Sequence, residues 1–147
     1  MPLLSKSCIY GLRACMLIAS RREQAAFVAT RDLASELQLS PCFLTKILRS
    51  LTTAGILTSL RGPGGGVALA RPPAQVSLLD MLRVLQGPAL TRDCLLGRPQ
   101  CHDEGTCPVR NRWAKAHAEL QTLFAEVTLQ EWMARAHSIP PGAGLGT

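Results

Sequence analysis

The chain has 147 residues, of which 47% are hydrophobic, and it carries a formal net charge of +6. That length suits one compact domain with a core of its own, and two full-sized domains are not expected. The sequence shows no basic leader before an apolar segment, and no apolar run near the roughly 20 residues of a membrane span. We therefore expect a cytoplasmic protein that makes no membrane contact.

The net charge is unevenly placed along the chain. Residues 1–71 hold nine Lys and Arg against three Asp and Glu, whereas residues 72–147 hold seven of each sign. A basic half joined to a neutral half favours a nucleic-acid-binding surface, although a merely soluble basic domain would have the same composition.

Helical periodicity dominates the first third of the sequence. Residues 5–20 place apolar side chains on one face, which predicts an amphipathic helix. A second, short helix is expected from Thr30, as its N-cap, to about residue 38. Ser40 and Pro41 then mark the start of a third helix, which Gly55 ends. Two helices joined by a turn of about three residues predict a helix-turn-helix.

A glycine-rich segment follows, with the sequence TSLRGPGGGVALAR at residues 58–71. Short apolar runs around Leu60 and at residues 67–69 flank RGPGGG, which predicts a β-hairpin with Arg61 at its tip. A hairpin directly after a helix-turn-helix makes a winged helix. RGPGGG lacks the lysine and hydroxyl of a nucleotide-binding loop, and no catalytic arrangement is apparent, so we expect no enzymatic activity.

The second half of the chain predicts three more helices. Ser77 and Asp80 match a capping box before a short helix, and Thr128 caps a final short helix. Between them, residues 109–127 predict a long helix whose apolar stripe exceeds what one small domain needs. We expect this helix to form a homodimer interface, with dimerisation residues Trp113, Leu120, Leu123 and Phe124, because a pseudo-palindromic DNA site requires two reading heads.

Three cysteines lie within CLLGRPQCHDEGTC, at positions 94, 101 and 107. Their spacing is too wide for the C-x-x-C pairs of zinc ribbons and unlike the tight run of a bacterial ferredoxin. In a reducing cytoplasm, clustered cysteines favour metal binding or redox chemistry. Three interpretations stay open: an iron–sulfur cluster, a zinc site with one further ligand, and a thiol switch that forms a disulfide.

Four stretches together carry a resemblance to one family. They are LSKSCIYGLRA, LTKILRSLTTAGIL, SLRGPGGGVALAR and the three-cysteine segment before the long helix. Over roughly residues 4–135 the chain resembles the Rrf-two family of dimeric bacterial winged-helix regulators, which includes the iron–sulfur cluster regulator IscR and the nitric-oxide-sensing repressor NsrR. RGPGGG after AGIL is the most specific of these motifs.

The resemblance implies a mainly α fold with a small β-hairpin wing, in which a winged helix-turn-helix is joined to a long dimerisation helix. The expected units are a DNA-binding domain at 1–86, a cluster-binding loop at 87–108, the dimerisation and short C-terminal helices at 109–137, and a disordered tail at 138–147.

DNA contacts are expected from the motif's second helix, the wing and two helix starts. An α-helix fits the major groove of B-DNA, where Thr45 can bond a base or contact a thymine methyl group, and Lys46 and Arg49 can reach guanine or phosphate. Arg61 is suited to the minor groove, and helix N-termini favour phosphate. The expected DNA-binding residues are Ser5, Lys6, Thr30, Cys42, Thr45, Lys46, Arg49, Arg61, Gly62 and Gly64.

The resemblance also implies that Cys94, Cys101 and Cys107 hold a 2Fe–2S or 4Fe–4S cluster. Some relatives place a histidine three residues after the third cysteine, but this chain has Arg110 there, and a guanidinium is no metal ligand. Others use an acid in the partner's first helix. Cys8 lies beside the aligned position and is the candidate fourth ligand, with a packed core cysteine as the alternative.

The function implied is that of a DNA-binding transcriptional regulator, more specifically a repressor, whose operator binding is controlled by an iron–sulfur cluster that senses nitric oxide, redox or iron–sulfur status. The alternative is a cluster-free regulator, with zinc or a thiol switch, that responds to cysteine oxidation or a partner protein. A scaffold or thiol-dependent enzyme that uses the wing for protein contacts is a third possibility. DNA binding that does not depend on iron content would favour the cluster-free regulator. Absence of sequence-specific duplex binding would favour the scaffold or thiol-dependent enzyme.

Overall fold

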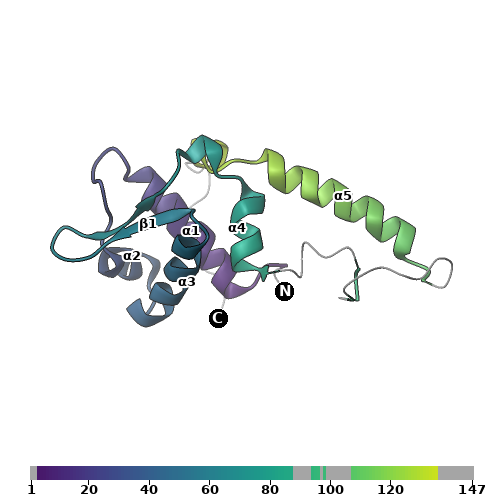
Figure 1. Ribbon diagram of the computed structural model, residues 1–147, viewed down its shortest axis with the longest axis horizontal. Coiled ribbons are helices and arrows are strands. Elements are labelled where there is room, and N and C mark those ends of the chain that lie inside the picture. The colour runs from purple at the N-terminus through teal and green to yellow at the C-terminus, as the bar shows by residue number, and fades with distance from the viewer. Residues whose placement is uncertain (1–2, 88–93, 97, 99–106, 136–147) are drawn as a thin grey trace.

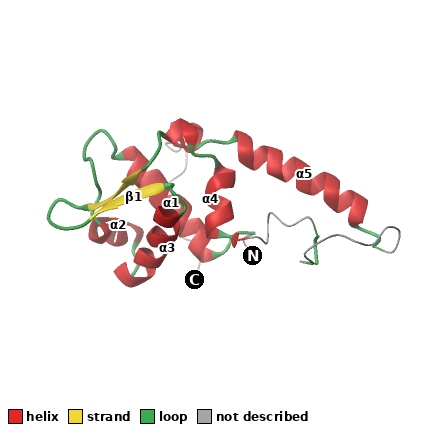
Figure 2. Cartoon of the chain, viewed as in Figure 1, coloured by secondary structure: helices red, strands yellow, loops and turns green. Residues whose placement is uncertain are grey.

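In the part of the chain that the structure describes, six α-helices, one short 3-10 helix and one antiparallel hairpin are arranged in the order of a winged helix followed by a long projecting helix (Figure 1, Figure 2). The computed structural model describes residues 3–87, 94–96, 98 and 107–135. This architecture confirms the predicted fold class. Its elements are α1 (Lys6–Ser20), α2 (Thr30–Leu37), α3 (Pro41–Thr53), β1 (Leu57–Leu60), β2 (Gly66–Leu69), the 3-10 helix η1 (Pro73–Gln75), α4 (Leu78–Leu85), α5 (Arg110–Glu126) and α6 (Leu129–Arg135).

Side-chain caps fix the starts of α1 and α3. The hydroxyl of Ser5 accepts a hydrogen bond from the N–H of Cys8 at 3.2 Å, and the hydroxyl of Ser40 accepts one from Phe43 at the same distance. Each bond satisfies a backbone donor that the first turn of a helix leaves unpaired. Pro41 begins α3, where its missing N–H costs nothing.

The start of α2 differs from the prediction by one residue. Ala29 is the N-cap and makes no side-chain cap bond, whereas Thr30 is already the first helical residue. The reason is a contact from another part of the chain: Val28 pairs with Val67 of β2, with N···O distances of 2.8 and 2.9 Å between the two backbones. This pairing holds the chain extended up to Ala29, so the helix begins directly after it.

The core of the molecule lies where α1, α3 and α4 pack together. On α3, Leu44, Ile47, Leu48 and Leu51 are buried, and Leu44 and Leu51 are fully enclosed. Gly11 allows the close approach of helices, because a Cβ added there would lie 2.6 Å from the side chain of Leu85 on α4. Among the described residues, no helix is long and apolar enough to cross a bilayer.

The wing is a two-stranded hairpin with its base in the core and its tip outside. Leu57 pairs with Leu69 at the base, where Leu57 is buried, and Leu60 pairs with Gly66 at the tip, where Leu60 is exposed. A lone two-stranded hairpin is marginal in water, so the wing depends on the contacts at its base and on the bridge to Val28.

The predicted capping box opens α4, with Ser77 and Asp80 bonded reciprocally. α5 then extends away from the body of the molecule, and α6 returns to pack against α1 and η1 (Figure 1). Thr128 caps α6 as expected, by accepting from the N–H of Glu131 at 3.2 Å. The predicted tail at 138–147 lies outside the described residues.

The apolar stripe expected on α5 divides into two faces. Phe124 is buried and Leu120 and Trp113 are half-buried, but Leu123 is 52% exposed. His117 completes the inward face, since it stands four residues after Trp113 and seven before Phe124, which is helical spacing. The ring of His117 packs against that of Trp113, with 5.6 Å between the ring centroids.

Candidate DNA-binding surface and cysteine segment

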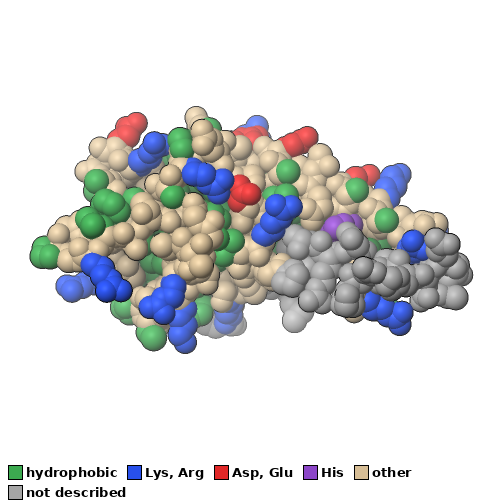
Figure 3. Space-filling model, viewed as in Figure 1, with side chains coloured by type: hydrophobic (Ala, Val, Ile, Leu, Met, Phe, Trp, Pro, Cys, Tyr) green, Lys and Arg blue, Asp and Glu red, His purple; other side chains and the backbone are tan. Residues whose placement is uncertain are grey.

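An open hollow of about 770 Å³ lies between α2, α3 and the wing. Basic side chains gather along the same edge of the molecule, over α2, α3 and the hairpin (Figure 3). The hollow brings together five residues that the sequence assigned to DNA, which come from three separate elements. They are Thr30, Thr45, Arg49, Arg61 and Gly62.

The exposed face of α3 has the polarity that a reading helix needs. Cys42, Thr45, Lys46 and Arg49 are all exposed, while the residues between them point into the core. The hydroxyl of Thr45 donates to the carbonyl of Pro41 at 2.7 Å. Its oxygen therefore offers outward only lone pairs, beside the threonine methyl group. Such a side chain can accept from the amino group of cytosine or adenine or contact a thymine methyl.

The wing tip carries one cationic side chain, that of Arg61, followed by residues without large side chains. Arg61 is exposed, and the turn after it is closed by a 2.9 Å hydrogen bond from the N–H of Gly65 to the carbonyl of Gly62. Gly62 and Gly64 have φ of +94° and +74°, with open space where a Cβ would stand. Both glycines leave the tip free for close approach to another backbone.

Ser5 and Lys6 are not part of this hollow, although both are exposed. The N–H of Ser5 donates to the side-chain carbonyl of Gln86, just after α4, at 2.9 Å. The start of α1 is therefore tied to the end of α4. Its expected contact with phosphate would form a separate part of the surface.

The hollow is also lined by polar residues that sequence reasoning did not assign to DNA, among them Arg31, Thr52 and Ser59. Thr52 could have been found, since it follows Arg49 by three positions and so shares its helix face. Arg31 adjoins Thr30 at the start of α2, which a search for anion-binding helix ends could have included. Ser59 is exposed on β1 opposite Val67, and only the folded arrangement places it beside the hollow.

The cysteine segment leads into α5 at the end farthest from the core (Figure 1). Cys94 and Cys107 are half-buried and neither forms a disulfide, whereas Cys101 lies outside the described residues. The carbonyl of Cys107 accepts from the N–H of Arg110, the first residue of α5, at 3.4 Å. Within the described ranges, His, Cys, Asp and Glu side chains form no group of three that could hold a metal ion.

Cys8 lies within the core of its own subunit. Its side chain is completely enclosed, and burial raises the pKa of its thiol to about 11. Burial raises the pKa of Cys15 to about 12 for the same reason. A metal ligand must be a thiolate, and enclosure in the core opposes both the loss of the proton and the approach of a cluster. This environment favours the packed-cysteine alternative for Cys8 over the role of fourth ligand.

Comparison with known proteins agrees with this architecture. The model of the Rrf2 family, described as an iron-dependent transcriptional regulator, matches residues 4–135. An rrf2-like HTH-type transcriptional regulator of Rhodobacter capsulatus is 30% identical over 132 residues, which cover 85% of this chain and 88% of that protein. An HTH-type transcriptional regulator of Mycobacterium tuberculosis is 33% identical over 129 residues, covering 87% and 79%.

Solved structures share the fold. CymR, the global cysteine regulator of B. subtilis, superposes with a TM-score of 0.74 at 24% identity, covering 91% of this chain and 98% of CymR. IscR of T. potens gives 0.73 at 23% identity, covering 97% and 94%. The relatives are regulators of transcription and not enzymes. The chain is therefore a member of the Rrf2 family, a winged-helix, DNA-binding regulator of transcription.

Proposed function

We propose that this regulator is a cytoplasmic homodimeric repressor whose grip on its operator is controlled by an iron–sulfur cluster. The ligands are Cys94, Cys101 and Cys107. The observation that carries the proposal is the position of these three cysteines, in the one segment that joins the winged helix to α5. The description of the matching family as iron-dependent supports iron as the metal.

The donor set fits such a group. Thiolates are soft ligands that suit iron–sulfur centres, and the half-buried Cys94 and Cys107 are accessible enough to bind one. Arg110 excludes the histidine that some relatives place at this position. When bound, a 2Fe–2S or 4Fe–4S cluster with three cysteine ligands supplies an iron open to nitric oxide or oxidants.

DNA binding is assigned to the hollow and its rims. α3 would enter the major groove, with Thr45, Lys46 and Arg49 toward the bases. Arg61 would then reach the adjacent minor groove, where the negative potential is strongest. The sugar–phosphate backbone of one DNA strand would then lie in the hollow, between α3 and the wing. There the guanidinium of Arg31 can neutralise a phosphate, and Thr30 at the start of α2 can donate a hydrogen bond to it.

The outward face of α5 is proposed as the dimer interface. Leu123 is a large apolar side chain, 52% exposed, in the last turn of a helix that projects from the body (Figure 1). Two such faces packed together would bury this side chain and pair the two reading heads over a pseudo-palindromic operator.

Replacing Leu123 with Lys is expected to convert the dimer to a monomer in the micromolar range, because a charge would enter the apolar centre of the interface. Light scattering after size-exclusion chromatography measures the mass. Ala125→Lys is the matched control, since Ala125 is also exposed but lies about 200° around α5 from Leu123. Equal dissociation of both variants, or of neither, would refute the assignment of this face.

The two ends of α5 give it the means to connect the parts. Cys107 stands three residues before its first turn. At its other end, Val127 and Leu129 are hydrogen-bonded to the segment before α4. A change at the cysteines can alter DNA binding only under one condition. The cluster-bound cysteine segment must be more stable when the two DNA-binding domains of the dimer are in one relative arrangement than in another.

The test is to purify the protein without oxygen, measure iron and sulfide, and select its duplex from a random library. We expect a coloured protein whose loaded and stripped forms differ about fivefold to 150-fold in affinity for one duplex at matched ionic strength, as coupling free energies of about 1–3 kcal/mol imply. Iron-free protein, or equal affinity of the two forms, would refute the cluster-sensing proposal.

A thiol switch is the second candidate function. Its support is that Cys42 is exposed on the reading face and that Cys107 has a free, half-buried thiol. A structural neighbour, CymR of Staphylococcus aureus, has been solved in an oxidized form. This candidate predicts that iron-free protein loses affinity on mild oxidation and regains it with a thiol reductant. A zinc site would instead give colourless protein that loses metal to chelators.

A further inference from the structure

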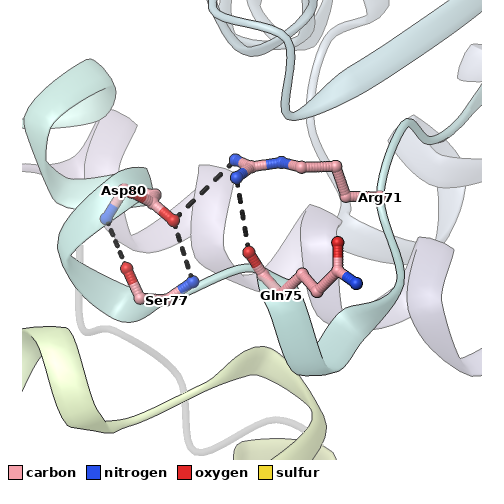
Figure 4. Close-up of polar contacts among 4 residues, drawn as sticks. All are labelled: Arg71, Gln75, Ser77 and Asp80. Carbon is pink, nitrogen blue, oxygen red and sulfur yellow. Dashed lines mark hydrogen bonds and ion pairs between the residues drawn. The ribbon is translucent and has the colours of Figure 1, made fainter.

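Arg71 stands at the base of the wing, two residues after β2 ends. Its guanidinium reaches forward to the start of α4 (Figure 4). One terminal nitrogen donates to the carbonyl of Gln75 at 3.3 Å, and the other lies 3.8 Å from a carboxylate oxygen of Asp80. The same oxygen of Asp80 accepts from the N–H of Ser77 at 3.1 Å, within the capping box. Arg71 thus joins the base of the wing to the first turn of α4.

The segment between these contacts is also bonded to α5. The N–H of Leu78 donates to the carbonyl of Val127 at 2.8 Å, and the N–H of Leu129 donates to the carbonyl of Val76 at 2.8 Å. This short antiparallel pairing attaches the end of α5 to residues 76–78, between Gln75 and Asp80. The two residues that hold Arg71 therefore flank the place where α5 is attached.

The wing tip is remote from this attachment. About ten residues of chain separate Arg61 from Arg71, and Arg71 does not line the hollow between α3 and the wing. At roughly 3.3 Å per residue along a strand, the four-residue strand and its turn put the tip well beyond the reach of an arginine side chain at the base. A direct contact of Arg71 with the same DNA backbone is thus not expected.

We infer that Arg71 is a positioning residue for DNA binding: its guanidinium fixes the angle of the wing on α4, and through residues 76–78 on the end of α5. The hairpin has two strands and depends on its base for orientation, so a loosened base misdirects Arg61 at the tip. The inference rests on the DNA-binding role proposed for the wing.

The test is a double-mutant cycle on the duplex that the wild-type protein selects, with every protein prepared in one cluster state. Arg71→Ala is expected to weaken binding about threefold to tenfold, up to what one arginine contact contributes. In an Arg61→Ala background, the same change is expected to cost less than about twofold, because no tip cation remains to be positioned. Arg83→Ala is the matched control, since it removes an exposed cation from α4 itself and should leave affinity within about twofold.

Arg71→Lys keeps the charge but loses the planar fork that spans Gln75 and Asp80, so it should weaken binding as well. Arg71→Lys is also the second test of the inference if Arg71→Ala folds poorly, which thermal melting followed by circular dichroism would reveal. Additive losses in the cycle, full rescue by lysine, or no loss at all would overturn the inference. Failure of the wild-type protein to select any duplex, or indifference to Arg61→Ala, would instead refute the proposed role of the wing.

Discussion

Cys107→Ser is expected to leave the protein with less than about one-tenth of its wild-type iron after anaerobic purification. A serine hydroxyl is a poor ligand for iron compared with a thiolate, and two remaining cysteines cannot hold a cluster against exchange with solvent. Cys94→Ser and Cys101→Ser are expected to behave in the same way. Iron and acid-labile sulfide, measured against protein concentration, report the loss directly and without any DNA.

Cys42→Ser is the matched control for this loss. Cys42 also lies outside any disulfide, but it is exposed on α3, and α5 projects away from that helix (Figure 1). We expect it to keep its full iron content. Melting temperatures of Cys42→Ser, Cys94→Ser and Cys107→Ser should stay close together, because these three thiols are exposed or half-buried. Full iron in Cys107→Ser, or equal loss in Cys42→Ser, would disprove the ligand assignment.

Cys8→Ala is expected to affect stability and not iron content, unlike the substitutions in the cysteine segment. The Cys8 side chain is enclosed in the core, so its truncation should lower the melting temperature by a few degrees while iron content stays unchanged. Loss of iron from a folded Cys8→Ala protein would show instead that this thiol serves as the fourth ligand despite its burial.

The helix-turn-helix could be predicted because its signals are local. Ser40 and Pro41 fix the start of α3 by hydrogen bonding and geometry within one turn, and the apolar spacing after them sets which side faces the core. The wing was predictable for a related reason. A run of glycines between two short apolar segments allows few arrangements other than a tight hairpin.

What the sequence could not give depends on contacts between distant segments. The bridge from Val28 to Val67 moves the start of α2, and it joins residues 39 positions apart that no local pattern connects. On α5, periodicity alone treated Leu123 as equivalent to Phe124. Only the packing of α5 on α4 decides that His117 and Phe124 face inward and Leu123 outward.

Gly66→Ala is expected to be the most damaging small substitution in the wing. A Cβ at this position would lie 2.1 Å from the carbonyl oxygen of Val28 and 2.8 Å from the N–H nitrogen of Ala29. Both atoms are backbone and cannot move aside without breaking the pairing of Val28 with Val67. Gly66 also has a φ of +145°, which side chains rarely adopt. We expect a loss of about 2–4 kcal/mol in unfolding free energy.

That loss should appear as a fall in melting temperature of roughly 5–15 °C for a chain of this size, and as at least tenfold weaker binding to the selected duplex. Gly64→Ala separates the two causes. Gly64 has a φ of +74° with nothing within 4 Å of the added Cβ, so it carries conformational strain without a clash and should cost about 1 kcal/mol. If the two variants lost the same stability, the clash with Val28 would contribute nothing. The wing would then be held by its own two strands and not by the segment before α2.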